Sequence, residues 1–388
     1  MPYATLLLLF FVSSLLSQSA RELHDQAFVV DAHNDVLLRA MEGEGLSVRT
    51  TKGHSDLPRL IDGGVDLQIF AIWVNPYAYL PDRAFQRALD MISKLEELAQ
   101  AAPQLTLIRT RQDLEPVTSQ QLLGAVIGVE GGHAIENSLE KLRILHQRGM
   151  RYLTLTWNNS TDWATSAKDE TKKDSLSFRG LTDFGKAVVR TCNEIGVLVD
   201  VSHVGEQTFW DVMEITTKPV IASHSCAYTL CPHFRNLKDE QLRAIAATGG
   251  VVGVNFYPGY LDPSFTTREK AVMAKYKPQL DSLAQQYGKE SDEYWYGKMA
   301  LLDAELAAVA PPVDGLINHI DYLVKIMGID HVGLGSDFDG IDVLPQGIKD
   351  CTDLPVITEK LLARGYNQEA IEKILGGNFR RVLETVMP

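Results

Sequence analysis

Histidine and carboxylate residues interrupt several otherwise apolar runs of this 388-residue chain, each at or just after the C-terminal end of a run. A buried imidazole or carboxylate costs several kcal/mol unless it is paired or bound to a metal. Together these side chains form a donor set that suits zinc or a similar divalent ion. The pattern therefore predicts a shared metal centre rather than separate core groups. The residues are His33, Asp35, Glu130, His203, His224 and Asp337.

The spacing of these residues indicates two cation sites. His33 and Asp35 are two residues apart, so in a strand their side chains point to the same face and can hold one ion. His203 and His224 end two successive runs, VDVSH and VIASH, and can supply a second site. Glu130 ends the run GAVIGVE, and a carboxylate there can bridge two metals about 3.5–4 Å apart with a hydroxide between them.

Asp337 lies in GLGSDFDG, at the end of the last apolar run. Hydrolysis needs a group that orients the water and protonates the leaving nitrogen, and we expect Asp337 to handle this proton. We expect Asp339 to face away or to stabilise the turn. Asp31 lies one step deeper than His33, where support of a ligand is favoured over ligation. His133 is left open between a supporting role and ordinary packing.

Eight short, nearly continuous apolar runs alternate with amphipathic segments, which predicts a (β/α)8 TIM-type barrel whose strand ends all open on one face. The LTLI stretch at 105–108 is a possible ninth strand, which leaves a doubly wound sheet as the alternative. The polar, helical segment 258–312 predicts an insertion after the seventh strand, and its Tyr294, Trp295 and Tyr296 form a candidate lid. The runs are 28–35, 65–74, 124–131, 151–158, 197–204, 219–225, 250–257 and 331–340.

Composition narrows the class of protein. The chain is 45% hydrophobic and 22% charged, as globular proteins are, and its net charge of −13 without a basic cluster argues against nucleic acid. Residues 1–20 hold an apolar run followed by small residues, which predicts an export signal too short to span a bilayer. We therefore expect one domain over 21–388, periplasmic or secreted, without a stable membrane anchor. Four scattered cysteines give no disulfide framework.

From about Ala27 to its end the chain resembles the membrane (renal) dipeptidases, in the amidohydrolase-like barrel group. The motifs that carry the resemblance are VVDAHND, IGVEGGH, RYLTLTWN, DVSHV, ASHS, CPHFRN, VVGVNFY and GLGSDFDG. The resemblance implies zinc-dependent hydrolysis of dipeptides with two zinc ions per chain. It places the first zinc on His33 and Asp35 and the second on His203 and His224, with Glu130 between them.

The same resemblance implies the substrate contacts. Arg235 matches the arginine that binds the substrate's C-terminal carboxylate, a pairing that suits its fork of donors. Tyr260 matches an aromatic contact to the same end, and Asn158 and Gly340 complete the expected set. One position departs from the family. Mammalian members carry a histidine where this chain has Trp157, whose indole can donate a hydrogen bond but cannot accept a proton.

Two other functions stay open. One is a barrel hydrolase for lactones, N-acyl amino acids or phosphoesters; the absence of a lysine from TLTWN favours the glutamate-bridged dipeptidases over barrels with a carboxylated lysine. The other is a non-catalytic, metal-containing homologue that binds dipeptides, with Trp157 filling its pocket. The choice of zinc over manganese or cobalt rests on ligand type alone, and a homodimer remains an option.

Overall fold

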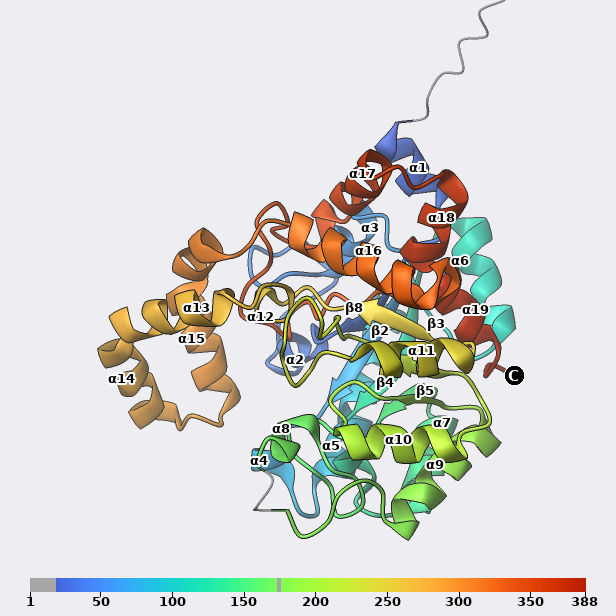
Figure 1. Ribbon diagram of the computed structural model, residues 1–388, viewed down its shortest axis with the longest axis vertical. Helices are drawn as coiled ribbons and strands as arrows, with labels where there is room; N and C mark the ends of the chain where they lie inside the picture. The colour runs from blue at the N-terminus through green and yellow to red at the C-terminus, as the bar shows by residue number, and fades with distance from the viewer. Residues whose placement is uncertain (1–18, 173–175) are drawn as a thin grey trace, which may run out of the picture.

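The computed structural model describes residues 19–172 and 176–388, and within them eight parallel strands close into a barrel (Figure 1). Neighbouring strands follow the order β2-β1-β9-β8-β7-β6-β5-β4, and β4 pairs with β2 to complete the ring. This confirms the predicted barrel. The strands are β1 (Val30–Asn34), β2 (Leu67–Trp73), β4 (Leu123–Glu130), β5 (Met150–Thr154), β6 (Leu198–Asp200), β7 (Val220–Ala222), β8 (Val251–Val254) and β9 (Val332–Leu334).

The possible ninth strand exists but does not open the barrel. Strand β3 (Leu105–Leu107) pairs only with the first residues of β4, with Leu105 opposite Leu123. Beyond that point β5 takes the same edge of β4, while β2 lies along the other edge over its whole length. The doubly wound sheet is therefore wrong, because the β2–β4 pairing leaves no open edge in the ring.

Helices cover the outside of the barrel, and the predicted amphipathic segments are among them. Ser138 and Thr182 cap the first turns of α7 and α9 with their hydroxyls, and Gly196 ends α9 in the left-handed region, where glycine is favoured. The helices outside the insertion are α1 (Ala20–Gln26), α2 (Leu37–Met41), α3 (Leu57–Asp62), α4 (Pro76–Tyr79), α5 (Ala84–Ala101), α6 (Glu115–Gln120), α7 (Leu139–Gln147), α8 (Ala167–Glu170), α9 (Asp183–Ile195), α10 (Glu206–Ile215), α11 (Asp239–Ala247), α16 (Asp314–Met327), α17 (Pro355–Ala363), α18 (Gln368–Glu372) and α19 (Asn378–Glu384).

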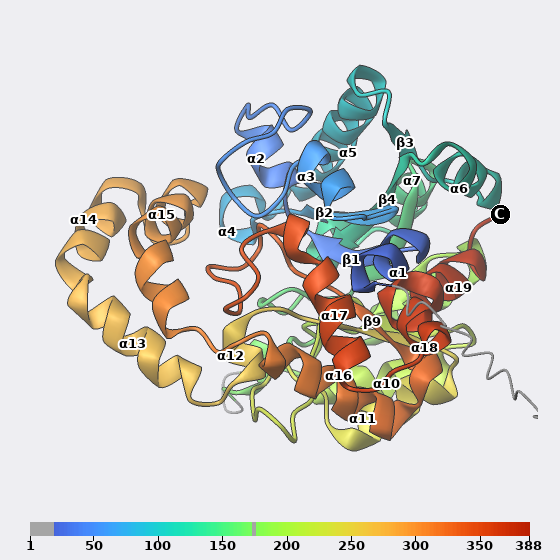
Figure 2. The same cartoon turned by 90° about the horizontal axis from the view of Figure 1, so that it is seen from above.

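The helical insertion follows the seventh barrel strand, β8, as predicted. Figures 1 and 2 show α13, α14 and α15 projecting to one side of the barrel. These helices have a small core of their own, which includes Phe265, Leu302 and Leu306 and reaches Val343 in the loop after β9. The insertion is therefore a packed unit joined to the barrel mouth. Its helices are α12 (Pro258–Leu261), α13 (Phe265–Lys275), α14 (Lys277–Tyr287) and α15 (Asp292–Val309).

One cluster of buried side chains joins the first halves of the strands to α19. Phe379, Val382 and Leu383 of α19 pack in this cluster with strand residues such as Val30 and Leu67. The C-terminal helix therefore closes the end of the barrel where the strands begin. The opposite end, where the strands finish, is left for the polar residues.

The predicted export signal lies almost wholly outside the described residues, and only Ser19 and Ala20 of it are described. Ser19 caps α1, accepting a hydrogen bond from the backbone of Glu22. In the described part of the chain, no helix combines the length and the apolar character needed to cross a bilayer. All four cysteines are buried and unpaired.

Candidate metal centre

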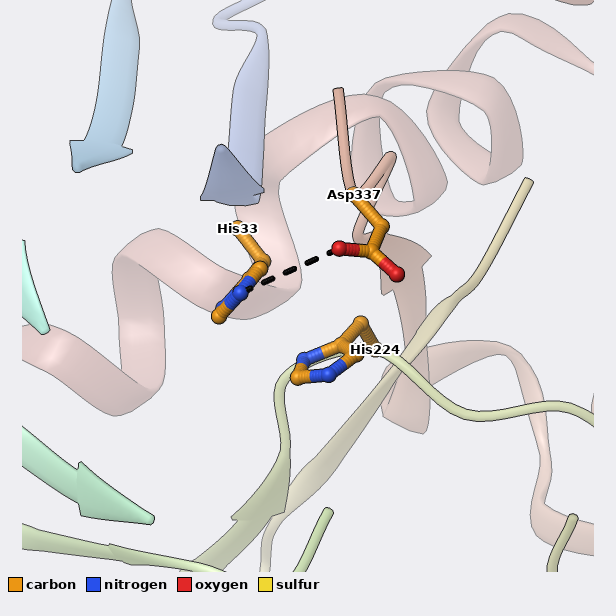
Figure 3. Close-up of side chains that lie close together, drawn as sticks. All are labelled: His33, His224 and Asp337. Atoms are coloured by element: carbon orange, nitrogen blue, oxygen red, sulfur yellow. Dashed lines mark ion pairs between the residues drawn. The ribbon is translucent and has the colours of Figure 1, made fainter. Parts of the chain in front are cut away.

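Six side chains from the C-terminal ends of the strands meet in one buried cluster. His33 Nε2 lies 3.3 Å from Asp35 Oδ2, 3.5 Å from Glu130 Oε2 and 4.0 Å from Asp337 Oδ1. Figure 3 shows His33 facing Asp337 with the His224 ring beside them, and the two imidazole centroids are 3.9 Å apart. The predicted ligands and the predicted proton donor Asp337 therefore share one small volume, although they are up to 304 positions apart in the chain, from residue 33 to 337.

Glu130 stands between two groups of ligands. Its Oε1 lies 3.0 Å from His203 Nε2 and 3.4 Å from His224 Nε2, while its Oε2 faces His33. Three sets of donors have all their donor atoms within 4.8 Å of one another, and one of them is His33–His224–Asp337. The other two, His33–Asp35–Glu130 and Glu130–His203–His224, share Glu130. This is the arrangement expected of a carboxylate that bridges two cations.

Contacts at the Nδ1 atoms of two histidines bear on which ring nitrogen carries the proton. His203 Nδ1 faces the Asn158 side-chain oxygen at 3.2 Å, and His224 Nδ1 faces Ser223 Oγ at 2.8 Å. If both Nδ1 atoms carry the proton, both Nε2 atoms turn lone pairs into the cluster, where they lie only 2.9 Å apart. Two facing lone pairs at this distance repel unless a cation lies between or beside them. His33 Nε2 also lacks a hydrogen-bond partner, so the residues present fit a metal centre.

The pKa values in the cluster are shifted in different directions. Burial alone would lower the pKa of His33, but Tyr152 and the carboxylates of Glu130 and Asp35 raise that pKa well above its usual range. Burial, together with Arg235, lowers the pKa of His203 to about 4. Burial alone would raise the pKa of Glu130, but the surrounding histidines hold that pKa well below its usual range. Burial, reinforced by the neighbouring carboxylates, raises the pKa of Asp337 to about 7. At neutral pH Glu130 is therefore charged and His203 neutral, as ligation requires, whereas Asp337 can hold a proton.

The backbone at two of these positions is unusual. His203 has φ 65° and Asp337 has φ 63°, in the left-handed region that non-glycine residues rarely adopt. Asp339 shares this conformation, with φ 62°. Each such residue costs about 1 kcal/mol, and conformations of this kind gather at functional sites. They turn the chain sharply at the strand ends, which aims the side chains of His203 and Asp337 inward.

The nearby polar residues that were not predicted as ligands lie outside the cluster. Asp31 accepts hydrogen bonds from Ser336 and Gln68 and so holds the turn that leads to Asp337. Asp339 accepts from the Ser55 hydroxyl and faces the loop after α2. His133 bonds the backbone oxygen of Val74 at 2.8 Å and serves packing.

A cavity of about 350 Å³ opens beside the cluster, and four of the predicted substrate residues line it: Trp157, Asn158, Tyr260 and Gly340. Asp35, Glu130, His203 and Asp337 form its floor. Residues 289–292, with Trp295 and Tyr296, bring the insertion to its edge, whereas Tyr294 does not line it. Two of the three aromatic residues proposed as a lid are therefore at the pocket.

Arg235, the fifth predicted substrate residue, is buried behind Tyr260. Its guanidinium carbon lies 5.6 Å from the centroid of the Tyr260 ring, and its Nη2 donates to the backbone oxygen of His224 at 3.1 Å. Its Nε has no hydrogen-bond partner. A buried guanidinium with a free donor next to a pocket residue is an available anion site.

Several residues of the site were not predicted from the sequence. Asn255 donates to Asp337 Oδ2 at 2.9 Å, and the Tyr152 hydroxyl lies 2.8 Å from His33 Nδ1. Trp73 lines the cavity with its ring centroid 5.0 Å from that of Trp157. Asp200, an acid inside the apolar run VLVDV, bonds Ser223. Only Asp200 carried the signal that revealed the ligands, which is a charge inside a buried strand.

The closed (β/α)8 barrel and the two-part centre of histidines and carboxylates at its strand ends assign this protein to the metal-binding barrels. The family model of membrane dipeptidase, peptidase family M19, matches residues 17–387. The chain therefore belongs to this family, and the resemblance predicted from its motifs is confirmed.

Known proteins of the family resemble the chain over most of its length. Mouse dipeptidase 3 is 32% identical over 369 residues, which cover 92% of this chain but only 64% of the mouse protein. The crystal structure of dipeptidase AC, an M19 metallopeptidase, superposes with a TM-score of 0.73 at 28% identity over 93% of this chain and 99% of its own. The metallopeptidase of Rhodobacter sphaeroides, with a phosphinate mimic of the dipeptide L-Ala-D-Ala, gives a TM-score of 0.73 at 27% identity over the same shares of the two chains.

Proposed function

We propose that this protein is a metal-dependent dipeptidase that works with two zinc ions. The observation that carries the proposal is the position of Glu130, whose two carboxylate oxygens face two separate groups of ligands. A similar structure supports the substrate class, since the metallopeptidase of Rhodobacter sphaeroides binds a phosphinate mimic of a dipeptide. The chain spans about two thirds of the curated relatives it matches, so its activity is inferred from the site as much as from them.

In this proposal His33 and Asp35 hold the first zinc, His203 and His224 hold the second, and Glu130 bridges them. When bound, the pair of ions would polarise the substrate carbonyl and bring the pKa of a water near neutrality. No lysine reaches this cluster from β5, in keeping with a glutamate bridge.

Other side chains bind the substrate and move the proton. Asp337 Oδ1 faces the cluster and, with its pKa raised by burial, can pass a proton to the departing amine. Asn255 holds the other oxygen of Asp337 in place. In this proposal Arg235 and Tyr260 take the substrate's C-terminal carboxylate, which would set the length of the substrate, and the support is that their side chains lie together, 5.6 Å from guanidinium carbon to ring centroid.

Zinc analysis of the purified protein together with a panel of L,L- and L,D-dipeptides tests this proposal. We expect two zinc ions per chain and hydrolysis of unblocked dipeptides, with little hydrolysis of their C-terminal amides. A protein that holds fewer than two ions, or that hydrolyses the amides equally well, contradicts it. Arg235→Ala sharpens the test: loss on dipeptides with little loss on uncharged esters separates carboxylate recognition from damage to His224, which Arg235 also contacts.

A non-catalytic, dipeptide-binding homologue is the second candidate because of Trp157. The ring centroid of Trp157 lies 6.4 Å from that of His203, next to the proposed second zinc. Trp157 forms a wall of the cavity, however, and leaves about 350 Å³ open. Tight dipeptide binding without turnover in the zinc-loaded protein, and turnover in Trp157→His, would favour this candidate.

We also propose that residues 1–20 direct export to the periplasm or the outside of the cell, leaving a single domain over 21–388. The support is the apolar run from Leu6 to Leu16 followed by small residues. Sequencing the N-terminus of the protein from cell fractions tests this: a mature chain that starts near Arg21 in an exported fraction is expected.

A further inference from the structure

We propose that two separate chains of buried hydrogen bonds hold the two metal sites, one through Tyr152 and the other through Ser223 and Asp200. These residues act as positioning residues behind His33 and His224. The inference rests on the proposed metal centre, and it adds that either site can be weakened without the other.

The second-site chain begins at Asp200, the last residue of β6. Its Oδ2 accepts hydrogen bonds from Ser223 Oγ at 2.6 Å and from Thr154 Oγ1 at 2.6 Å. Its Oδ1 accepts from the backbone nitrogens of Ser202 and Ser223 at 3.0 and 2.8 Å. Four donors from three strands and their ends fix this carboxylate, and all of these residues are fully buried.

The lengths of these bonds set the direction of the chain. Ser223 Oγ has three possible acceptors, Asp200 Oδ2 at 2.6 Å, His224 Nδ1 at 2.8 Å and Ser202 Oγ at 3.4 Å, and the shortest, charge-assisted bond takes the proton. The lone pairs of Ser223 then remain for the proton of His224 Nδ1, at 2.8 Å. This fixes the tautomer of His224 and leaves its Nε2 free for a metal, as outer partners of metal-binding histidines generally do.

The first-site chain is built on an aromatic ring. The Tyr152 hydroxyl lies 2.8 Å from His33 Nδ1 and 3.3 Å from the backbone oxygen of Ala32, so it can accept from the histidine while donating to the carbonyl. The ring lies flat against Gly128 of the neighbouring strand, where a β-carbon would come closer than 3.0 Å to three of its carbons. Gly128 therefore makes the space that brings a tyrosine hydroxyl to His33.

The two chains do not share a residue, and in the described part of the protein no hydrogen bond joins them. Tyr152 lies on β5 and reaches β1, whereas the other chain joins β6 with the residue after β7 and, through Thr154, with the end of β5. The outer ring nitrogen of the other second-site ligand, His203, has one contact in the described part of the chain, with the side-chain oxygen of Asn158 at 3.2 Å. The second site thus relies most on the serine that supports His224.

Ser223→Ala and Tyr152→Phe remove one hydroxyl from each chain and test the inference. Cobalt titration against a competing chelator gives two dissociation constants, and zinc anomalous diffraction at limiting zinc shows which site empties. We expect Ser223→Ala to weaken the His203–His224 site about 10–100-fold and Tyr152→Phe to weaken the His33–Asp35 site by a similar factor. The untouched site in each variant should keep its dissociation constant within about threefold, well under the change expected at the weakened site.

Matched variants separate positioning from general damage to the fold. Ser223→Thr keeps the hydroxyl and should restore the affinity of the second site. Thr358→Val removes another buried hydroxyl, which lies 2.7 Å from Nδ1 of a histidine outside the cluster, His24, and Tyr322→Phe removes a hydroxyl that bonds Asp239. Both controls should leave the two dissociation constants unchanged.

The possible outcomes distinguish failure of this inference from failure of the proposed function. Equal weakening of both sites by either variant, or no weakening by Ser223→Ala, overturns the inference while two bound ions in the unaltered protein keep the proposed function. Fewer than two ions in the unaltered protein overturns both. Should Tyr152→Phe fail to fold, the Ser223 variants still decide, because loss with alanine and recovery with threonine at one site alone is required.

Discussion

Gly340 shows how a residue without a side chain shapes the acidic side of the site. A β-carbon at this position would lie closer than 3.0 Å to the carboxylates of both Asp35 and Asp337. Any other residue would therefore push apart a proposed zinc ligand and the proposed proton donor. The glycine is needed for space, because its φ is not in the left-handed region.

Gly340→Ala should accordingly lower kcat/KM on a dipeptide by about 100-fold, since displacements near 1 Å among reacting groups have effects of this size. Steady-state kinetics and zinc content measure the change. Gly45→Ala is the control, because no atom would lie within 4 Å of its new carbon. Equal activity of the two variants would show that the two carboxylates can move freely.

Asp337→Asn tests the proton transfer. The amide keeps the shape of the side chain and its contact with Asn255 but cannot deliver a proton, so kcat should fall by about 10²–10⁴. Zinc content should be measured alongside, because Asp337 lies near His33 and a loss of metal would mimic a loss of acid. A variant with full zinc and nearly unchanged kcat assigns the proton to another group.

At the residue scale, the proposed ligands were easier to predict from the sequence than the residues that hold them in place. His33, Glu130 and His224 stand out because a polar group in a buried strand needs a partner. Tyr152 gives no such signal, since an aromatic residue is ordinary in a strand and only the fold brings its hydroxyl to His33. Arg235 lies at the expected end of the site, but its burial behind Tyr260 follows from tertiary packing alone.

At the scale of elements, the insertion meets the barrel through a few polar contacts at the pocket. The side-chain nitrogen of Asn75, which precedes α4, donates to the backbone oxygen of Glu290 at 2.9 Å and to Asp292 Oδ1 at 3.0 Å. Lys298 of α15 forms an ion pair with Asp342 in the loop after β9. The segment 258–312 predicted the insertion, but no periodicity in it predicted these docking contacts.

Asn75→Asp should loosen this contact. The carboxylate keeps the acceptor that caps α4 but loses both donated bonds and adds a charge beside Asp292. Because residues 289–292 line the pocket, KM for a dipeptide should rise about tenfold with a smaller change in kcat, as expected when binding contacts are lost. An unchanged KM would mean that residues 289–292 do not contact the substrate.

Asp66, just before β2, gives a pH dependence of folding. Its carboxylate accepts from the backbone nitrogen of Val29 at 2.7 Å, and burial raises its pKa to about 6. Since the pKa in the unfolded chain is lower, near 3.9, folding binds a proton in this range, and the contribution of Asp66 is lost as the pH rises from about 4 to 6. Asp66→Asn should therefore change the free energy of unfolding more favourably at pH 8 than at pH 4. The difference between the two changes should be up to about 3 kcal/mol. Denaturant unfolding of metal-free protein measures this, and an equal effect at both pH values contradicts it.

At the scale of the whole molecule, the barrel was predictable because eight buried strand runs alternate with amphipathic helices. The closure was not, because only the pairing of β2 with β4 shows that β3 lies outside the ring. The cluster of acids and imidazoles is the other whole-molecule feature, since it joins the ends of strands from both halves of the chain. Burial raises the pKa of two of these acids, Asp35 and Asp337, so their charged forms are unfavourable in the folded protein unless a cation lies beside them.

Removal of metal should therefore lower the melting temperature. A ligand at 1,000 times its dissociation constant adds about 4 kcal/mol of stability, which for a protein of this size corresponds to roughly 5–10 °C. Thermal melts of chelator-treated protein, with and without added zinc, check this. Identical melting temperatures would argue against metal binding in the folded state. Magnesium serves as the control, because it prefers oxygen ligands and should not restore stability.

The natural cysteines are all buried, which makes it practical to test whether the insertion moves. They are Cys192, Cys226, Cys231 and Cys351. Burial raises the pKa of each thiol, so none is a ready nucleophile towards a maleimide at neutral pH. A new cysteine at exposed Glu293 would thus react selectively without deletion of the natural four. A fluorophore attached there would report, through its emission, whether α15 moves towards the barrel when a dipeptide enters.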